Sequence, residues 1–486
     1  MGGFPHSIHF TGLNKPIRAE HAVRNLEIIG EIPREIDGAF FRAVPDPAHP
    51  PIFEDDILLS ADGMISRFSI HDGHVDHDIR FVETARFKAE RAARRALFGK
   101  YRNPFTNHPS VEGVDSTVAN TTPVWHGGRL LMTKEDGHAY EVDPASLATI
   151  GSWTFNGRLR SQTMTAHPRL DPVTGEMFFF GYEANGLCTT DIAYCIADKS
   201  GELVSEQWFK APYCASLHDF AITENYAIFP LFPTTADLAR LKAGGEHWAH
   251  QQDLESWVAI MPRYGKVDDV RWFKGPKGVS AFHLVNAFED GGLVHLDHCL
   301  SDTCAFAFMR EAGGINRAPQ DIKGALTRWT FDMAKPGDSF VERPLGPPGD
   351  LPRLRDADQG RAYESAWYLT MNPQGGPPIP GGPVGAMFNA LVEVFPATGR
   401  LAMLGLKPGM GLSEPVHVPS RDADKAGWLL TVVDTQMGED DFRSELWVLD
   451  AGDITRGAVA RALLPVRARP QVHGVWVSSA ELARTR

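Results

Sequence analysis

The sequence predicts an all-β protein, and a β-propeller fits it better than a sandwich or a barrel. Short apolar runs rich in Val, Leu, Phe and Trp recur along the whole chain, and runs of about four to eight such residues between turn residues are typical of strands. The chain contains 46 glycines and 35 prolines, which fall mainly between the apolar runs. Helical periodicity is scarce, so no α/β alternation is indicated.

The expected strands follow one another along the chain. Clear examples are GRLLMT (128–133), EMFFFGY (176–182), YAIFPLF (226–232), SWVAIMPR (256–263), GLVHLDH (292–298), ALVEVFPATGR (390–400), GWLLTVVD (427–434) and ELWVLDA (445–451). The turns between strands are short, and examples are HDGH (71–74), HGG (126–128), EDGG (289–292) and PATG (396–399). Because short turns of this kind connect antiparallel strands, we expect hairpins throughout.

Two segments carry a helical pattern. Residues 86–102 have a weak apolar side that includes Phe87 and Leu97. Residues 234–250 offer Thr235 or Asp237 as an N-cap, since both side chains accept a hydrogen bond from a free backbone N–H at a helix start. Helices are therefore expected to be a minor part of the fold.

Length helps to separate the all-β architectures. A sandwich or barrel made from 486 residues would normally divide into domains, whereas a propeller packs blade against blade in one ring. At about 40–70 residues per blade, the chain would form about seven blades. No Pro/Gly/Ser-rich linker divides the chain, so we expect a single domain over residues 1–486. No exact repeat is visible, and the propeller is the favoured architecture without being the only one.

Composition and charge limit the partners. With 43% hydrophobic and 22% charged residues, the chain is typical of a soluble globular protein. A net charge of −13 argues against nucleic acid and against an anionic membrane surface as partners. The N-terminal residues contain no apolar stretch long enough for a signal peptide. The five cysteines form no pattern and suit reduced thiols, so we expect a cytoplasmic protein.

Four histidines share one local setting, in or beside an expected strand. They are His167, His218, His283 and His473, which are 51, 65 and 190 residues apart in the sequence. These separations are far too wide for one local metal motif such as HExxH. Ligands so dispersed meet only if the fold brings strand ends to a common axis, as the inner strands of a propeller do. Spacing alone leaves a metal site and ordinary structural histidines both open.

Five ordered motifs resemble the carotenoid cleavage oxygenases, a family of non-haem iron enzymes. The motifs are TAHPRLDPVTGE (165–176), HDFAITENY (218–226), FHLVNAFEDG (282–291), SEPVHVP (413–419) and VHGVWV (472–477). The resemblance extends from about residue 10 to the C-terminus. It implies a seven-bladed β-propeller under a dome of loops and short helices, with one Fe(II) per subunit on its axis. The family's four histidine ligands match His167, His218, His283 and His473.

The resemblance also implies carboxylates around the metal. Imidazole is a suitable ligand for iron, and outer carboxylates orient each ring and offset the metal charge. The family uses three glutamates, of which Glu135 and Glu414 match two. Asp350, in GDLPRL, occupies the third position. Because Asp is shorter by one C–C bond of about 1.5 Å, we expect either a shifted backbone with a direct hydrogen bond or a bridging water.

Within the family, the segment ERAARRALFGKYRNPFT (90–106) resembles the bacterial lignostilbene dioxygenases. These enzymes cleave the central double bond of 4-hydroxystilbenes with O₂ to give two aromatic aldehydes. Tyr101 and Lys134 match the catalytic pair that holds the substrate phenol. A phenol with a pKa near 10 is mostly protonated at neutral pH, and donors to its oxygen stabilise the phenolate. Without the resemblance, a salt-bridged lysine beside a tyrosine at the edge of the core would be the simpler interpretation.

Four further residues are expected at the site. Thr121 matches a threonine near the open coordination position of the family's iron. Leu59 stands where the stilbene-cleaving members often have a Phe against the substrate ring, and the lost stacking is worth about 0.5–1.5 kcal/mol. Phe306 and Phe308, in CAFAFMR, are expected on the opposite wall of the pocket, although core packing explains them equally well.

Three functions are left open by the sequence. The favoured one is an iron dioxygenase that acts on small stilbene-type phenols. The second is a carotenoid or apocarotenoid cleavage dioxygenase, but residues 234–250 are too polar for the interfacial patch that membrane-extracting members carry. The third is a non-enzymatic propeller that serves as a binding scaffold, because fold does not dictate function. A homodimer is an open alternative to a monomer.

Overall fold

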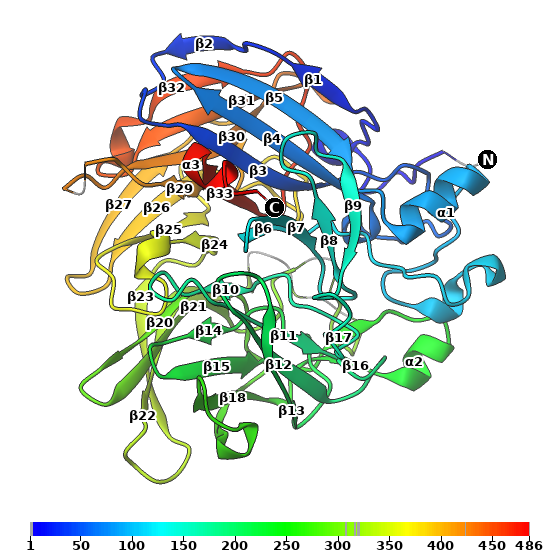
Figure 1. Ribbon diagram of the computed structural model, residues 1–486, viewed down its shortest axis with the longest axis vertical. Coiled ribbons are helices and arrows are strands. Elements are labelled where there is room, and N and C mark those ends of the chain that lie inside the picture. The colour runs from blue at the N-terminus through cyan, green and yellow to red at the C-terminus, as the bar shows by residue number, and fades with distance from the viewer. Residues whose placement is uncertain (1–2, 307–308, 315–316, 318–320, 423, 486) are drawn as a thin grey trace. The chain divides into compact units, whose positions relative to one another are not determined.

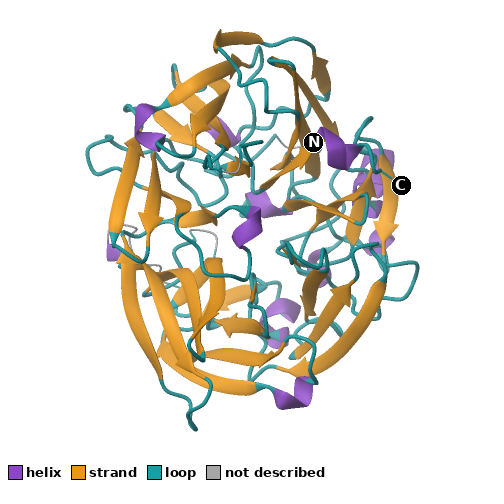
Figure 2. Cartoon of the chain, turned by 60° about the vertical axis from the view of Figure 1, so that its left-hand side comes forward, coloured by secondary structure: helices purple, strands orange, loops and turns teal. Residues whose placement is uncertain are grey.

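A computed structural model describes residues 3–306, 309–314, 317, 321–422 and 424–485 (Figure 1). Strands are the main regular secondary structure of the described chain, and its helices are short (Figure 2). The α-helices are α1 (Ala85–Ala93), α2 (Leu238–Lys242) and α3 (Ser479–Leu482). Single 3₁₀ turns lie at Gly12–Asn14, Leu58–Ser60, Pro104–Thr106, Pro109–Val111, Val267–Asp269, Asp356–Asp358 and Ile454–Arg456. None of the helices in these ranges has the length and apolar character needed to cross a bilayer.

The chain divides into two compact units. Unit 1 comprises Met1–Trp153, Met371–Val392 and Ala402–Arg486, and unit 2 comprises Thr154–Thr370 and Glu393–Leu401. The expectation of one domain over residues 1–486 stays a prediction.

Unit 1 contains three antiparallel sheets. The first has the order β1 (His21–Val23), β5 (His74–Phe81), β4 (Gly63–His71), β3 (Gly38–Pro45) and β33 (Gly474–Ser478). The second is β6 (Thr122–His126), β7 (Arg129–Thr133), β8 (Ala139–Val142) and β9 (Thr149–Trp153). The third is β2 (Glu27–Gly30), β32 (Ala458–Leu463), β31 (Phe442–Asp450), β30 (Trp428–Gln436) and β28 (Met410–Leu412), with β29 (Val416–Val418) also paired to β30.

Unit 2 contains three four-stranded sheets and one two-stranded ribbon. One sheet is β10 (Arg169–Leu170), β11 (Met177–Tyr182), β12 (Asp191–Ala197) and β13 (Leu203–Lys210). The next is β14 (Ala221–Ile222), β15 (Tyr226–Leu231), β18 (Glu255–Pro262) and β19 (Arg271–Lys277), and its β15–β18 connection carries the ribbon of β16 (Thr234–Ala236) and β17 (Trp248–His250). The last is β20 (Ser280–Asp290), β21 (Leu293–Ser301), β22 (Gly324–Asp332) and β23 (Phe340–Gly346).

A seventh sheet makes the fold a seven-bladed β-propeller. It is formed by β24 (Asp350–Arg353), β25 (Ala366–Thr370), β26 (Ala390–Phe395) and β27 (Arg400–Gly405). The two ends of the chain share sheets, since β33 pairs with β3 and β2 pairs with β32. These pairings hydrogen-bond the first part of the chain to its last part in two sheets. The predicted all-β propeller is confirmed.

The predicted hairpin turns form because their residues adopt positive φ angles. Asp72 and Gly73 have φ values of 46° and 81°, and they connect β4 to β5 with His71 opposite His74. Gly127 and Gly128, at 58° and 74°, connect β6 to β7 in the same way. Two successive positive φ angles match the twist of antiparallel strands, and Asn, Asp and Gly reach them most easily.

Both predicted helices exist, and the first is shorter than its pattern. α1 begins after Thr84, whose hydroxyl accepts a hydrogen bond from the Phe87 N–H at 3.1 Å. It ends at Arg94, which is in the left-handed region. The Glu90 carboxylate then accepts hydrogen bonds from the N–H groups of residues 97 and 98, so the chain turns away before Tyr101. Asp237 caps α2, one of the two caps that the sequence predicts.

Neighbouring blades bury apolar side chains between them within each unit. In unit 1, Phe40 and Phe68 of the first sheet pack with Leu430 and Leu446 of the third. In unit 2, Trp329 and other side chains of the β20–β23 sheet pack with the β14–β19 sheet. Full burial of one such side chain stabilises the fold by about 1.5–3 kcal/mol. This framework holds the loops and strand ends that carry the predicted histidines.

Candidate metal centre

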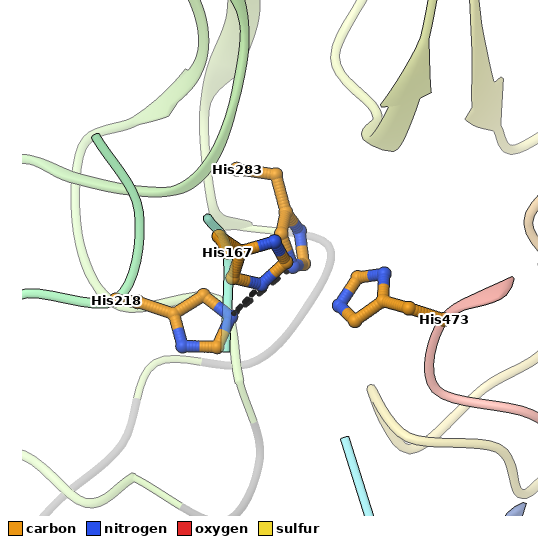
Figure 3. Close-up of side chains that lie close together, drawn as sticks. All are labelled: His167, His218, His283 and His473. Carbon is orange, nitrogen blue, oxygen red and sulfur yellow. Dashed lines mark hydrogen bonds between the residues drawn. The ribbon is translucent and has the colours of Figure 1, made fainter. Parts of the chain in front are cut away.

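Three histidines of unit 2 direct their imidazole rings toward one point (Figure 3). His167 lies before β10, His218 before β14, and His283 within β20. Nε2 of His218 lies 2.9 Å from Nε2 of His167 and 3.3 Å from Nε2 of His283. Two nitrogens that bind one metal at about 2.1 Å lie about 3.0 Å apart when they subtend a right angle. The three rings therefore have the spacing of ligands to one ion.

An irregular stretch of β20 presents His283 to this cluster. β20 pairs with β21, but the register shifts between Ala281 and Leu284 and again between Leu284 and Asn286. Such irregularities re-aim side chains that a regular strand would point to alternate faces. The apolar pattern of the sequence indicates the strand and carries no signal for the bulge.

His473, in unit 1, lies one residue before β33, and Glu414 fixes its ring. Nδ1 of His473 is 2.9 Å from Oε1 of Glu414, whose Oε2 accepts a hydrogen bond from the Gly474 N–H at 3.1 Å. When Nδ1 donates to this carboxylate, Nε2 is the ring nitrogen that can bind a metal. The candidate ligand atoms of His473 and of the three histidines above all lie within 4.8 Å of one another (Figure 3). This four-histidine group has the donor chemistry of a metal site.

Asp350 reaches its histidine directly. Oδ1 of Asp350 lies 2.8 Å from Nδ1 of His283 and also accepts a hydrogen bond from the Leu351 N–H at 2.9 Å. The next residue, Leu351, has a φ of 53°, and the pairing of β24 with β25 is irregular between Asp350 and Arg353. Of the two expected solutions for the shorter side chain, the structure has the direct hydrogen bond, and no bridging water is needed.

Glu135 is buried beside a cation that the sequence analysis did not single out. Its side chain is almost fully enclosed, and Oε1 lies 4.0 Å from Nη1 of Arg102. Arg102 directly follows Tyr101 and has a positive φ of 52°. A buried carboxylate requires a partner of opposite charge or several hydrogen bonds. The role of Glu135 as an outer carboxylate of the metal site stays a prediction.

Tyr101 and Lys134 lie against each other in unit 1. Lys134 directly follows β7 and is 2% exposed, and its Nζ lies 5.1 Å from the centroid of the Tyr101 ring. The Leu59 carbonyl oxygen lies 3.5 Å from the same Nζ. Burial lowers the pKa of Lys134, although the carboxylates of residues 136 and 135 oppose the shift. Burial also raises the pKa of Tyr101 well above its usual value, so its hydroxyl stays protonated and can donate.

Asn120, which the sequence analysis overlooked, connects Thr121 to the Leu59 turn. Its Nδ2 donates to the carbonyl oxygens of Leu59 and Ala61 at 3.1 and 2.8 Å, and its Oδ1 accepts from the Thr121 hydroxyl at 3.1 Å. The Thr121 carbonyl accepts a hydrogen bond from the His473 N–H at 3.1 Å. Asn120 is fully buried. The only sequence signal for it is a polar residue between the apolar Val118–Ala119 pair and β6.

An aromatic pair borders the histidines of unit 2. The Phe306 ring lies 3.9 Å from that of Phe282, and the Phe282 ring lies 4.0 Å from that of His218, between ring centroids. Phe282 is half-buried, whereas Phe306 is buried. The sequence analysis named Phe306 and missed Phe282, which stands next to a predicted ligand in the chain. Phe308, also named, lies outside the described residues.

Comparisons with known proteins give a full-length likeness. Residues 14–478 match the family model described as RPE65, retinal pigment epithelial membrane protein. The chain is 39% identical to lignostilbene-α,β-dioxygenase isozyme III of Sphingomonas paucimobilis, over 99% of each chain. It is 38% identical to resveratrol cleavage oxygenase 1 of Aspergillus fumigatus, over 99% of this chain and 97% of the relative. The crystal structure of Pseudomonas brassicacearum lignostilbene dioxygenase superposes with a TM-score of 0.94, at 39% identity, over 99% of this chain and 100% of that chain.

Proposed function

The chain belongs to the RPE65 family, the carotenoid cleavage oxygenases, and on this premise we propose that it is a non-haem Fe(II) dioxygenase of 4-hydroxystilbenes. The proposed reaction breaks the central C=C bond and adds one atom of O₂ to each carbon, which gives two aromatic aldehydes. The observation that carries the proposal is the group of four histidines whose candidate ligand atoms lie within 4.8 Å of one another. Its full-length relatives are named for lignostilbene and resveratrol cleavage.

The donor set suits a ferrous ion. His167, His218, His283 and His473 would hold it through neutral imidazole nitrogens, which leaves the metal charge uncompensated. Asp350 hydrogen-bonds to one of these rings at 2.8 Å and Glu414 to another at 2.9 Å. Two carboxylates bring two negative charges, which offset the +2 charge of Fe(II) and fix the tautomers of the rings. When bound, Fe(II) would supply the redox chemistry with O₂.

Tyr101 and Lys134 are proposed to bind the substrate phenol. The buried Lys134 ammonium would attract a phenolate oxygen, and the Tyr101 hydroxyl would donate to the same oxygen because its raised pKa keeps it protonated. These two donors lower the pKa of the substrate phenol. Loss of the phenol proton raises the electron density of the conjugated alkene, which is the bond to be oxidised. Lys134, whose pKa is lowered by burial, is suited to exchange that proton.

The same pair weighs against the carotenoid alternative. A carotenoid hydrocarbon carries no acidic hydroxyl, so it would offer the Lys134 ammonium and the Tyr101 hydroxyl no phenolate oxygen to bind. The scaffold alternative gives no reason for four converging imidazoles that are backed by two carboxylates. A cytoplasmic location is part of the proposal, because the five cysteines form no pattern that suits a disulfide framework.

Turnover of paired substrates tests the proposal. Protein purified without oxygen and loaded with Fe²⁺ should consume one O₂ per 4-hydroxystilbene and release two aldehydes, as followed with an oxygen electrode and chromatography. The 4-methoxy analogue cannot form a phenolate and should react at least about a hundredfold more slowly, if loss of an oriented charge interaction costs what it does in other enzymes. Rapid cleavage of the methoxy analogue would contradict activation through the phenol.

A further inference from the structure

We propose that Asp219 and Arg169 form a clamp that holds the three histidine segments of unit 2 in position for metal binding. The inference rests on the proposed function, because it concerns the metal affinity of that same site. Neither residue is among the expected ligands or their outer carboxylates. Both act through the backbone segments on either side of them, so they are positioning residues.

Asp219 connects the segment of His218 to that of His283. It directly follows His218 in the chain, and its Oδ2 accepts a hydrogen bond at 2.9 Å from the N–H of Leu284, the residue after His283. Its Oδ1 accepts from the N–H of the next residue, Phe220, at 2.8 Å. One carboxylate therefore fixes the distance between two backbone segments, and each segment carries one imidazole of the cluster.

Arg169 adds the third segment. It lies two residues after His167, and its Nη2 is 2.6 and 2.7 Å from the two carboxylate oxygens of Asp219. Its Nε donates to the Phe220 carbonyl at 2.7 Å, and its Nη1 donates to Oε1 of Gln359 at 3.3 Å. All three guanidinium nitrogens are thus used, each on a different group. The chain around His167 cannot shift without breaking several of these hydrogen bonds.

A hydrogen bond between the side-chain amides of Gln359 and the buried Asn286 extends the clamp toward the seventh blade. Nε2 of Gln359 donates to Oδ1 of Asn286 at 3.2 Å. Nδ2 of Asn286 donates to the carbonyl oxygens of Asp358 and Arg361 at 3.0 and 2.8 Å. Asn286 is fully buried in β20, three residues after His283. The loop that follows β24, the strand of Asp350, is therefore tied to the same network.

The position of the ion pair argues for a role in metal binding. The side chains of Arg169 and Asp219 are only 13% and 2% exposed, and removing two charges from water costs about as much as their attraction returns. Stability alone is thus a weak reason for such a pair. A site built from three separate segments gains metal affinity when the donors are held in place before the ion binds, since groups around the ligands contribute about 10–100-fold to affinity.

The test compares metal affinity with thermal stability in matched variants. Asp219→Asn keeps the size of the side chain and removes the charge that holds Arg169. The dissociation constant for Fe²⁺ is measured without oxygen by chelator competition, and Co²⁺ absorption reports the coordination geometry. We expect the Fe²⁺ dissociation constant to rise about 10–100-fold and the Co²⁺ spectrum to change.

The control is a second buried ion pair of unit 2. Arg328 donates from Nε and Nη2 to the two oxygens of Asp297 at 2.7 Å each, and the side chains are 12% and 0% exposed. Asp297→Asn should lower the melting temperature as Asp219→Asn does and leave the Fe²⁺ dissociation constant unchanged. An equal loss of affinity in the control would overturn the clamp, because the loss would then follow from general destabilisation.

Arg169→Lys keeps the inference testable if Asp219→Asn fails to fold. Lysine keeps a positive charge opposite Asp219, but it cannot also reach the Phe220 carbonyl and Gln359. The Fe²⁺ affinity of Arg169→Lys should therefore lie between those of the wild type and Asp219→Asn. A folded Arg169→Lys or Asp219→Asn protein with wild-type affinity would refute the clamp. A wild-type protein that itself binds no Fe²⁺ would instead refute the proposed function, which is a distinct outcome.

Discussion

Nδ1 of His283 and Oδ1 of Asp350 lie 2.8 Å apart, although aspartate is the shorter of the two acidic side chains. The backbone next to this contact is irregular, because Leu351 takes a φ of 53° and β24 departs from regular pairing. A residue with a side chain rarely adopts this conformation, and the cost is of order 1–3 kcal/mol. This conformational cost falls on the residue that follows Asp350. We infer from it that direct contact between the Asp350 carboxylate and the His283 ring is functionally required.

Replacing Asp350 with Asn should therefore weaken metal binding. The amide keeps the shape of the side chain but loses the negative charge that offsets the metal and orients His283. We expect the Fe²⁺ affinity to fall about 10–100-fold, as for other residues that hydrogen-bond to metal ligands. Metal titration without oxygen measures it, with the exposed Asp356 changed to Asn as the control. Unchanged affinity in Asp350→Asn would argue against a metal-bound His283.

His283→Ala should abolish stable metal retention, because it removes one of four donors and leaves Asp350 without its partner. His295 is a suitable control, since it lies on the neighbouring strand β21 and its Nδ1 is 2.9 Å from the Thr330 hydroxyl instead of the cluster. Protein purified without oxygen is analysed for iron by mass spectrometry. We expect near-stoichiometric iron in His295→Ala and little in His283→Ala. An iron-replete, active His283→Ala protein would remove this histidine from the ligand set.

The strands were predictable because each blade repeats one local rule. Runs such as EMFFFGY alternate with turns, and the structure has β11 at Met177–Tyr182 with every residue buried. The two-residue turns at Asp72–Gly73 and Gly127–Gly128 follow from the residue types alone. Helix length was less predictable, because α1 ends where Glu90 caps the next turn, and no local pattern signals that contact.

The site was predictable only in part, for a related reason. Histidines beside strands and the motifs around them indicated His167, His218, His283 and His473 as a group. Asn120, Asp219 and Phe282 escaped notice because their partners are distant in the sequence. Asp219, for example, contacts Arg169 and Leu284, which are 50 and 65 residues away in the chain. A buried polar residue gains its meaning from such partners, and composition or periodicity does not encode them.

Lys134→Met should slow the cleavage of 4-hydroxystilbenes and leave the metal in place. Methionine fills similar space, but it removes the ammonium that is proposed to stabilise the phenolate. Loss of one oriented donor typically costs about 10²–10³ in kcat. Lys210→Met, which removes an exposed lysine paired with Asp191, is the control. Steady-state kinetics at full iron occupancy measures the effect, and unchanged kinetics in Lys134→Met would mean that Lys134 does not contact the substrate.

Tyr101→Phe and Lys134→Met should be strongly non-additive. Both side chains are proposed to donate to the same phenol oxygen, and Nζ of Lys134 lies 5.1 Å from the Tyr101 ring centroid. Residues that act on one atom give a double variant little worse than the worse single one. The measurement is a double-mutant cycle on kcat/KM at full iron occupancy. If the fold-loss of kcat/KM in the double variant equals the product of the two single fold-losses, Tyr101 and Lys134 act separately.

Asp62→Asn should stabilise the protein above pH 6. Burial raises the pKa of Asp62 to about 6, and within the described residues its Oδ1 has no hydrogen-bond partner. The folded state therefore binds a proton that the unfolded state, with a pKa near 3.8, releases between about pH 4 and 6. Stability is consequently lost as the pH rises through this window, and above it the wild type carries the full penalty.

The expected gain for Asp62→Asn is about 1–3 kcal/mol at pH 8, given about 1.4 kcal/mol for each unit of pKa shift. The amide still accepts the hydrogen bond that Asp62 receives from the Ala48 N–H at 2.9 Å. Urea unfolding at pH 5 and pH 8 measures the gain, with the exposed Asp253 changed to Asn as the control. A variant that is stabilised equally at both pH values would contradict the assigned cause.

Leu59→Phe should strengthen the binding of 4-hydroxystilbene and weaken the binding of its 3-methoxy analogue. Leu59 is half-buried between the buried Leu58 and Ser60, and its carbonyl is held by Asn120 at 3.1 Å, so its backbone position is fixed. An added ring offers stacking worth about 0.5–1.5 kcal/mol, or about 2–10-fold in KM, to an unsubstituted phenol ring. The same ring narrows the slot for a 3-methoxy group, whose KM should rise. The measurement is KM for 4-hydroxystilbene and for its 3-methoxy analogue in the wild type and in Leu59→Phe. The kcat at full iron occupancy is the internal control. Equal changes for both substrates would mean that Leu59 does not contact the ring.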